Sequence, residues 1–434
     1  MNGVEVSPWT LRYVAVAVAS FLLAQALMVL GLSYPIRPLA APATLATVHL
    51  VTIGWLTLLM LGVLHQFIPV IGAKRLHSQA ASGVTFWLVA GGLVLLVLGF
   101  LSMPSLLLPI GGTLVLAGVL IAVWNLGVTL AASRPLRLPA LYVTASLCFL
   151  TLTVLLGVSF AVALTLPEVF APATIGALLT RGIALHLLGG IGGWFGLTAM
   201  GVADRLLAMF ALAPEDRGRA RHWAFWLVSV GIGASWLAGL ILTLMPSPVV
   251  QDIGMLGWGA LFIGVALYLF DMRELFRRRR RRELEANAVF GRVSLWALGV
   301  AAAMTAFAGV LSQFASLAPA LVYALLVGWL SGLALSQLYK IVPFLTWLER
   351  YGKTLGKTRV PRVQDLVVER RARPMFWLYF GGAAVGTLGM VVVSEWLLRL
   401  GALLTLVGTL GIAREIWLVR HPKTEPVPSD RQSA

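Results

Sequence analysis

Apolar residues gather into about twelve long runs that follow one another along the whole chain, with polar connections between them. Each run supplies the roughly 20 residues that a helix needs to cross a hydrocarbon layer ~30 Å thick. The pattern therefore predicts an all-α, polytopic membrane protein. The predicted helices are centred near Ala17, Trp55, Val94, Leu116, Leu152, Trp194, Ile232, Phe262, Ala302, Trp329, Val385 and Thr405.

Composition agrees with this interpretation. Of the 434 residues, 59% are hydrophobic and 12% are charged, and a soluble domain could not hide that much apolar surface from water. Cys148 is the single cysteine, which excludes a disulfide framework and a thiolate metal cluster.

The net charge of +16 is distributed according to topology. Basic residues cluster after helices two, four, six, eight and ten, and the intervening connections carry almost none. By the positive-inside rule, both termini are expected on the cytoplasmic side of the cell membrane. The six-arginine run 277–282 is interpreted as an anchor for anionic lipid, so membrane lipid is an expected partner and nucleic acid is not.

Three copies of one pattern divide the predicted helices into groups of four. The second helix of each group holds a Gly-Trp pair, and the third opens with Phe-Trp-Leu. The pairs end at Trp55, Trp194 and Trp329, and the tripeptides begin at Phe86, Phe225 and Phe376. We expect three repeats over residues 1–138, 139–290 and 291–420, followed by a cytoplasmic tail at 421–434. Helices one, five and nine contain no comparable motif, so they are assigned to the three repeats by their position alone.

The fourth helix of each group has two glycines seven residues apart. They are Gly111 and Gly118, Gly257 and Gly264, and Gly401 and Gly408. A spacing of seven returns to the same helix face after two turns, so each pair predicts a smooth stripe that a neighbouring helix can approach closely.

Three four-helix arcs differ from the plan of the commonest twelve-helix transporters, which have two halves of six helices. A ring of three arcs also encloses spaces in which a cofactor or a solute can sit.

Two of the six histidines, His49 and His186, lie well inside the predicted apolar layer, both in its outer third. A polar group at that depth must be paired or desolvated, which makes it a functional hypothesis. When Trp55 is superposed on Trp194, the histidines are offset by two residues, and two residues turn a helix by roughly 200°. Equivalent positions on helices two and six point the same way round a ring of repeats, so a difference of about half a turn lets the two histidines face each other across the gap between the helices. There they can share a haem or a metal ion. The alternative is two structural histidines, each bonded to a neighbouring helix.

Further polar residues lie at the cytoplasmic ends of the repeated helices. His65, the Asp204-Arg205 pair and Lys340 occupy equivalent places about ten residues after the three tryptophans. Snorkelling and ion pairing explain such residues, and a proton or ion path is the alternative. Arg181, five residues before His186, is a candidate partner for an anionic group such as a haem propionate.

The three-arc plan, with a histidine in helix two and another in helix six, resembles catalytic subunit I of the haem-copper oxidases, especially cbb3-type, nitric-oxide-reductase-like and NnrS-like members. The stretches 49–69, 186–210 and 328–345 carry the likeness. The resemblance implies one haem or a lone metal held by His49 and His186, a small gaseous ligand as a partner, and a role in respiratory or nitric-oxide-related metabolism.

The chain also departs from this family. The family's helix ten carries two histidines separated by one residue, whereas Leu321-Val322-Tyr323-Ala324 has none, and helix seven offers only His222 for copper. We therefore expect no copper, no complete binuclear centre and no oxygen-reducing oxidase activity. The alternatives are a cofactor-free channel or transporter and a scaffold or accessory membrane subunit.

Overall fold

The computed structural model describes residues 7–34, 36–245, 247–310, 314–352, 354 and 360–422, and within these ranges it contains helices and no strand. Twelve helices of this described part are long and apolar enough to cross a membrane, and each contains one of the predicted centres. The predicted all-α, polytopic class is confirmed.

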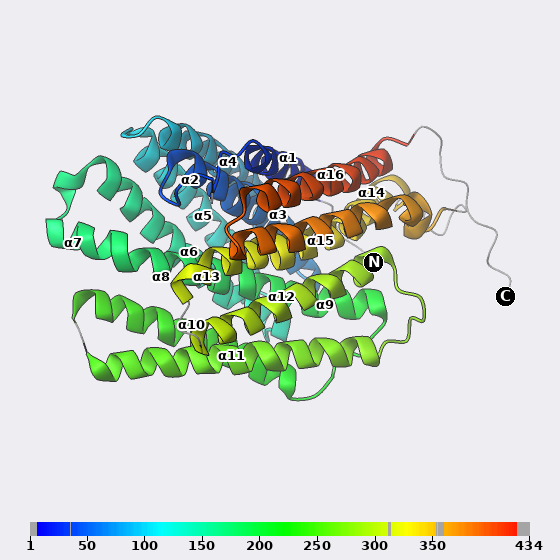
Figure 1. The fold of residues 1–434 in the computed structure, drawn as a ribbon. Helices are drawn as coiled ribbons and strands as arrows, with labels where there is room; N and C mark the ends of the chain where they lie inside the picture. The colour runs from blue at the N-terminus through cyan, green and yellow to red at the C-terminus, as the bar shows by residue number, and fades with distance from the viewer. Residues whose placement is uncertain are drawn as a thin grey trace. The chain divides into compact units, whose positions relative to one another are not determined.

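Nine of the spans are single α-helices (Figure 1). They are α1 (Thr10–Val29), α4 (Gln79–Leu101), α5 (Leu107–Ala131), α6 (Leu138–Thr165), α10 (Ala220–Leu244), α11 (Pro248–Arg277), α12 (Ala286–Val310), α15 (Glu369–Val391) and α16 (Glu395–Arg420). Two short 3₁₀ segments, η2 (Pro167–Val169) and η6 (Val363–Leu366), lie in connections.

The other three spans, helices two, six and ten, each contain a π-helical segment around the repeated tryptophan. They are α2 (Pro42–His49), η1 (Leu50–Thr57) and α3 (Leu58–Gly72); then α7 (Pro172–Ala177), η3 (Leu178–Gly182), α8 (Ile183–Leu187), η4 (Leu188–Gly196) and α9 (Leu197–Ala211); and then α13 (Phe314–Tyr323), η5 (Ala324–Ser331) and α14 (Gly332–Tyr351). The π-segments η1, η4 and η5 enclose Trp55, Trp194 and Trp329, which are all buried. Because π-helical turns are rare and concentrate at functional sites, the same feature in three helices directs attention to these levels.

Chain contacts divide the protein into two compact units. Unit 1 comprises Met1–Phe21 and Leu32–Arg281, and unit 2 comprises Leu22–Gly31 and Arg282–Ala434. The repeat boundaries at 138, 290 and 420 remain a prediction, and residues 423–434 of the predicted tail lie outside the described residues.

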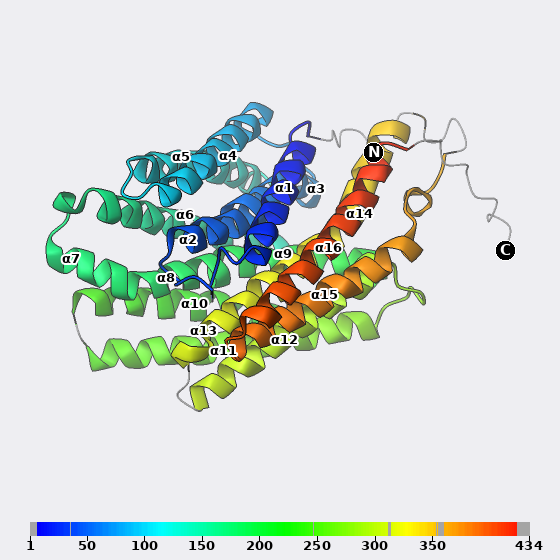
Figure 2. The same cartoon turned by 45° about the horizontal axis from the view of Figure 1, so that its top comes forward.

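The predicted glycine stripes form the seams of three helix hairpins. Within unit 1, α4 packs along α5 and α10 along α11, and within unit 2, α15 packs along α16 (Figures 1 and 2). A Cβ added at Gly92 would lie 2.7 Å from the carbonyl oxygen of Gly111, and one at Gly231 would lie 2.7 Å from that of Gly257. Backbones this close exclude any side chain, so the close approach expected from the spacing is confirmed.

An aromatic ring from the first helix of each group supplies a contact that the sequence pattern missed. Tyr13 of α1 lies 5.1 Å from the ring of Phe86, and Tyr142 of α6 lies 4.9 Å from the ring of Phe225. In unit 2, the ring of Phe290 on α12 stacks 4.5 Å from that of Phe376. Each ring therefore packs on the phenylalanine of a repeated Phe-Trp-Leu tripeptide.

Candidate functional site

Helices two and six are joined at the level of their π-segments in unit 1. The indole nitrogen of Trp194 donates a hydrogen bond to the hydroxyl of Thr57 at 3.1 Å, and both side chains are buried. His49 lies eight residues before Thr57, and His186 lies eight residues before Trp194. Because both helices contain a π-segment over this stretch, equal steps along them bring the two histidines to the same level.

His49 is half-buried at the end of α2. Its Nδ1 lies 2.7 Å from the carbonyl oxygen of Leu45, one turn earlier, and its ring packs 4.8 Å from that of Phe100. A carbonyl oxygen can only accept, so Nδ1 carries the proton and Nε2 keeps the lone pair. A backbone carbonyl that fixes the tautomer in this way is the usual support for a histidine that ligates a metal through its other nitrogen.

His186 is half-buried in α8 and lies against α6. A Cβ at Gly157 would lie 3.2 Å from its Cε1, and the ring of Phe160 stands edge-on at 5.5 Å. Its Nδ1 is buried and has no hydrogen-bond partner among the described residues, although the backbone of Thr153 lies near the ring. A buried nitrogen without a partner costs about 1–3 kcal/mol, a cost that a ligand could remove.

The two histidines therefore lie in unit 1 on spanning helices that the bond from Trp194 to Thr57 joins. That the two histidines share one ligand stays a prediction. Arg181 takes a different direction, because its guanidinium donates a hydrogen bond to the carbonyl oxygen of Leu242 near the end of α10. Its role as a partner for an anionic cofactor group stays a prediction.

Asp204, at the other end of helix six, belongs to a buried ion network. Arg217 donates to Asp271 through Nε at 3.1 Å and Nη2 at 2.7 Å, and it also binds Asp204. Arg221 donates to the second oxygen of Asp204 at 2.7 Å. The side chain of Arg217 is 0% exposed. Burial by itself lowers the pKa of Arg217, but the hydrogen bonds and charges of Asp271 and Asp204 outweigh it and raise the pKa above its ordinary value.

Arg217 and Asp271 were not among the residues predicted from the sequence. The available signal was the carboxylate of Asp271 near the end of an apolar helix, where an acidic group needs a cationic partner. The partner lies in the connection between α9 and α10, 54 residues earlier in the chain.

The remaining predicted residues also have neighbours in the structure. Arg205 forms an ion pair with Glu215, and Lys340 forms one with Glu285 within unit 2. His65 is 2% exposed and its ring lies 5.9 Å from that of Tyr13. The ion pairs agree with the structural interpretation of the helix ends, and a proton or ion path remains a prediction.

No cluster of three or more His, Cys, Asp or Glu side chains able to hold a metal ion occurs within the described ranges.

No known protein family and no curated protein sequence matches this chain.

Proposed function

We propose that this membrane protein binds one haem through His49 and His186 and acts in respiratory or nitric-oxide-related metabolism without a complete binuclear centre. The observation that supports it best is the hydrogen bond from Trp194 to Thr57, which joins the two spanning helices eight residues beyond His186 and His49.

The side chains around the pair suit an axial ligand set. The Leu45 carbonyl holds His49 in the tautomer that offers Nε2, and the buried Nδ1 of His186 lacks a hydrogen-bond partner among the described residues. Phe100 and Phe160 pack against the two rings and restrict their rotation. A haem whose two axial positions are filled by His49 and His186 would supply one-electron exchange.

The test is the visible spectrum of the full-length protein, expressed with haem available and purified in detergent. We expect a Soret band and about one haem per chain, the number that one bis-histidine site holds. His49→Ala and His186→Ala should each change the band. His77→Ala is the matched control because that ring lies outside the spanning segments, edge-on to Trp124 at 4.8 Å.

A second variant guards against simple misfolding. His49→Met keeps a side chain that can ligate haem iron, so we expect a shifted spectrum with haem retained. The absence of a Soret band, or an unchanged spectrum in both alanine variants, would overturn the proposal. The unsubstituted protein could instead hold one equivalent of metal and no haem, with the metal lost in both alanine variants. That result would also overturn the proposal of a haem, and the two histidines would then form a metal site.

A further inference from the structure

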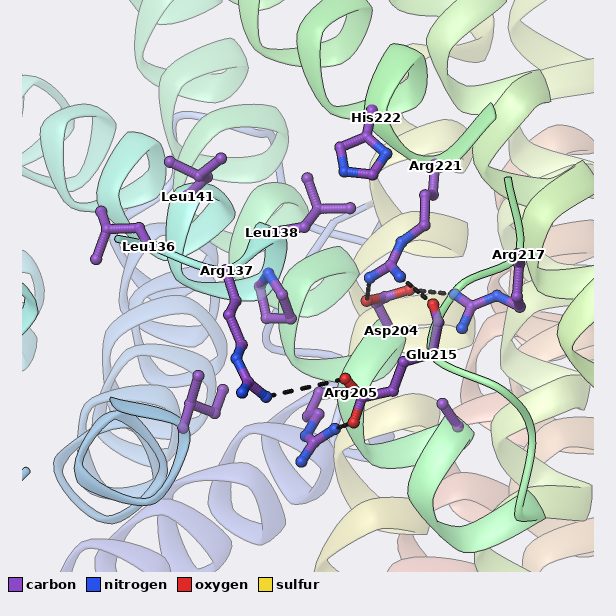
Figure 3. A pocket seen from close by; sticks show the side chains of 13 residues that line it. Leu136, Arg137, Leu138, Leu141, Asp204, Arg205, Glu215, Arg217, Arg221 and His222 are labelled. Atoms are coloured by element: carbon purple, nitrogen blue, oxygen red, sulfur yellow. Dashed lines mark hydrogen bonds and ion pairs between the residues drawn. The ribbon is translucent and has the colours of Figure 1, made fainter. Parts of the chain in front are cut away.

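A cavity of about 300 Å³ opens where α6 begins and α9 ends in unit 1, a size at the lower end of that of known ligand sites (Figure 3). Its lining combines four arginines and His222 with two carboxylates and an apolar wall. It lies on the side of the membrane that the distribution of basic residues assigns to the cytoplasm. It is independent of the histidine pair, since Asp204 follows His186 by 18 residues along helix six, roughly 25 Å.

Two of the four arginines are already neutralised at the back of the cavity. Arg217 is bound by both Asp204 and Asp271, and Arg221 is bound by Asp204. Two guanidinium groups and two carboxylates therefore form a closed set of zero net charge. This set joins α9, α11, the start of α10 and the connection between α9 and α10, and it contributes one wall of the cavity.

The other two arginines, at the mouth, share a single carboxylate. Arg205 binds one oxygen of Glu215, and Arg137 lies 3.9 Å from the other (Figure 3). The Arg137 side chain is 67% exposed and that of Glu215 is 59% exposed. The mouth therefore carries one positive charge in excess, on guanidinium groups that reach it from two different elements.

The wall beside this charge is apolar, with Leu138 and Leu141 of α6 and Ile71 of α3 among its residues. Guanidinium groups bind phosphate oxygens in pairs, and basic pockets between spanning helices at the cytoplasmic surface suit phospholipid headgroups. We propose that this cavity binds a phosphate group through the guanidinium groups of the mouth arginines Arg137 and Arg205. The group can come from an anionic phospholipid, whose chains would follow the apolar wall, or from free phosphate.

Glu215 occupies the place of that anion in the structure. A phosphate at the mouth competes with its carboxylate for the same two guanidinium groups. Glu215→Gln removes the competing charge and should tighten phosphate binding severalfold, an effect that a purely structural ion pair would not produce.

The experiment measures the thermal stability of the full-length protein in detergent as three probes are added. The probes are dioleoyl phosphatidylglycerol, dioleoyl phosphatidylcholine, and inorganic phosphate at matched ionic strength. We expect phosphatidylglycerol to raise the Tm of the unsubstituted protein more than phosphatidylcholine does. In R137Q/R205Q the concentration for half-maximal effect should rise by at least about tenfold, because two charge-assisted contacts are lost.

The matched control is R134Q/R273Q. It removes the same charge from two exposed arginines on the same side that do not line the cavity, and it should respond as the unsubstituted protein does. Arg137→Gln alone provides a further variant at a mostly exposed side chain, in case the double variant does not fold.

A response to phosphatidylglycerol alone supports the proposal with lipid as the source, and a response to inorganic phosphate as well supports it with free phosphate as the source. Equal responses in R137Q/R205Q and R134Q/R273Q, or no response of the unsubstituted protein to either anion, would overturn it.

Discussion

The hairpin seams allow a test with adjacent residues of the same type. Gly91 and Gly92 are neighbours on α4, but Gly92 faces α5 and Gly91 is exposed. A Cβ at Gly92 would lie 2.7 Å from the Gly111 carbonyl oxygen and 2.9 Å from the Val115 nitrogen, whereas a Cβ at Gly91 would meet no atom within 4 Å. Both obstructing atoms belong to backbone, so Gly92→Ala must push α4 and α5 apart.

The size of the effect follows from that geometry. Carbon and oxygen atoms in weak contact lie about 3.3 Å apart or more, so the helices must separate locally by roughly 0.5 Å. A gap of that size removes about a quarter of the dispersion energy of each contact along the seam. Overpacking of this kind destabilises a protein by about 1–3 kcal/mol. Alanine also raises helix propensity by about 0.5–1 kcal/mol, equally at both positions. The propensity gain cancels in the comparison, leaving Gly92→Ala less stable than Gly91→Ala by about 1–3 kcal/mol.

The assay is thermal unfolding of the two variants in the same detergent, followed by the fluorescence of the 15 tryptophans. Gly92→Ala should melt a few degrees below Gly91→Ala. The pair Gly382→Ala and Gly381→Ala on α15 should show the same order, because a Cβ at Gly382 would lie 2.7 Å from the Thr405 nitrogen and one at Gly381 would meet nothing within 4 Å. Equal melting temperatures within both pairs would refute the close-packed seams.

Two further predictions concern buried contacts in unit 1. Asp271→Asn leaves the fully buried Arg217 with an incomplete set of charged partners, so the protein should lose about 3–5 kcal/mol of stability in thermal unfolding. The control is Glu215→Gln, at a mostly exposed ion pair, which should cost under about 1 kcal/mol in the same assay. Trp194→Phe and Thr57→Val each remove the same buried hydrogen bond, which is worth about 1 kcal/mol. The stability lost in the double variant should therefore be smaller than the sum of the two single losses, and a double loss equal to that sum would contradict the bond.

The spanning helices and the glycine seams could be predicted because both depend on local pattern. A continuous run of about 20 apolar residues crosses lipid as a helix, because a helix pairs its backbone groups within a single segment. Glycines seven residues apart fall on one face of a helix whatever lies opposite, so Gly111 and Gly118 indicated close packing before the partner helix was known.

The candidate sites were only partly predictable. The offset between His49 and His186 follows from the repeat, but the bond from Trp194 to Thr57, which sets the two histidines level, depends on how two helices meet. Similarly, the sequence singled out Asp204 and Arg205 as a pair of neighbours, whereas the structure gives them separate partners in Arg217 and Glu215. Side chains one residue apart on a helix point about 100° apart, so adjacency in sequence says little about shared contacts.

The sequence by itself determined the all-α membrane class, the positions of the spans and the faces on which helices approach closely, because hydrophobicity and helical periodicity act over a few turns. Only the tertiary structure decided which charges neutralise one another, since Arg217 reaches Asp271 across 54 residues. It also decided which arginines keep an excess of charge at a cavity, since that depends on how many carboxylates the fold brings to each guanidinium group. Electrostatic partners are fixed by distance in space, and local sequence pattern carries no record of that distance.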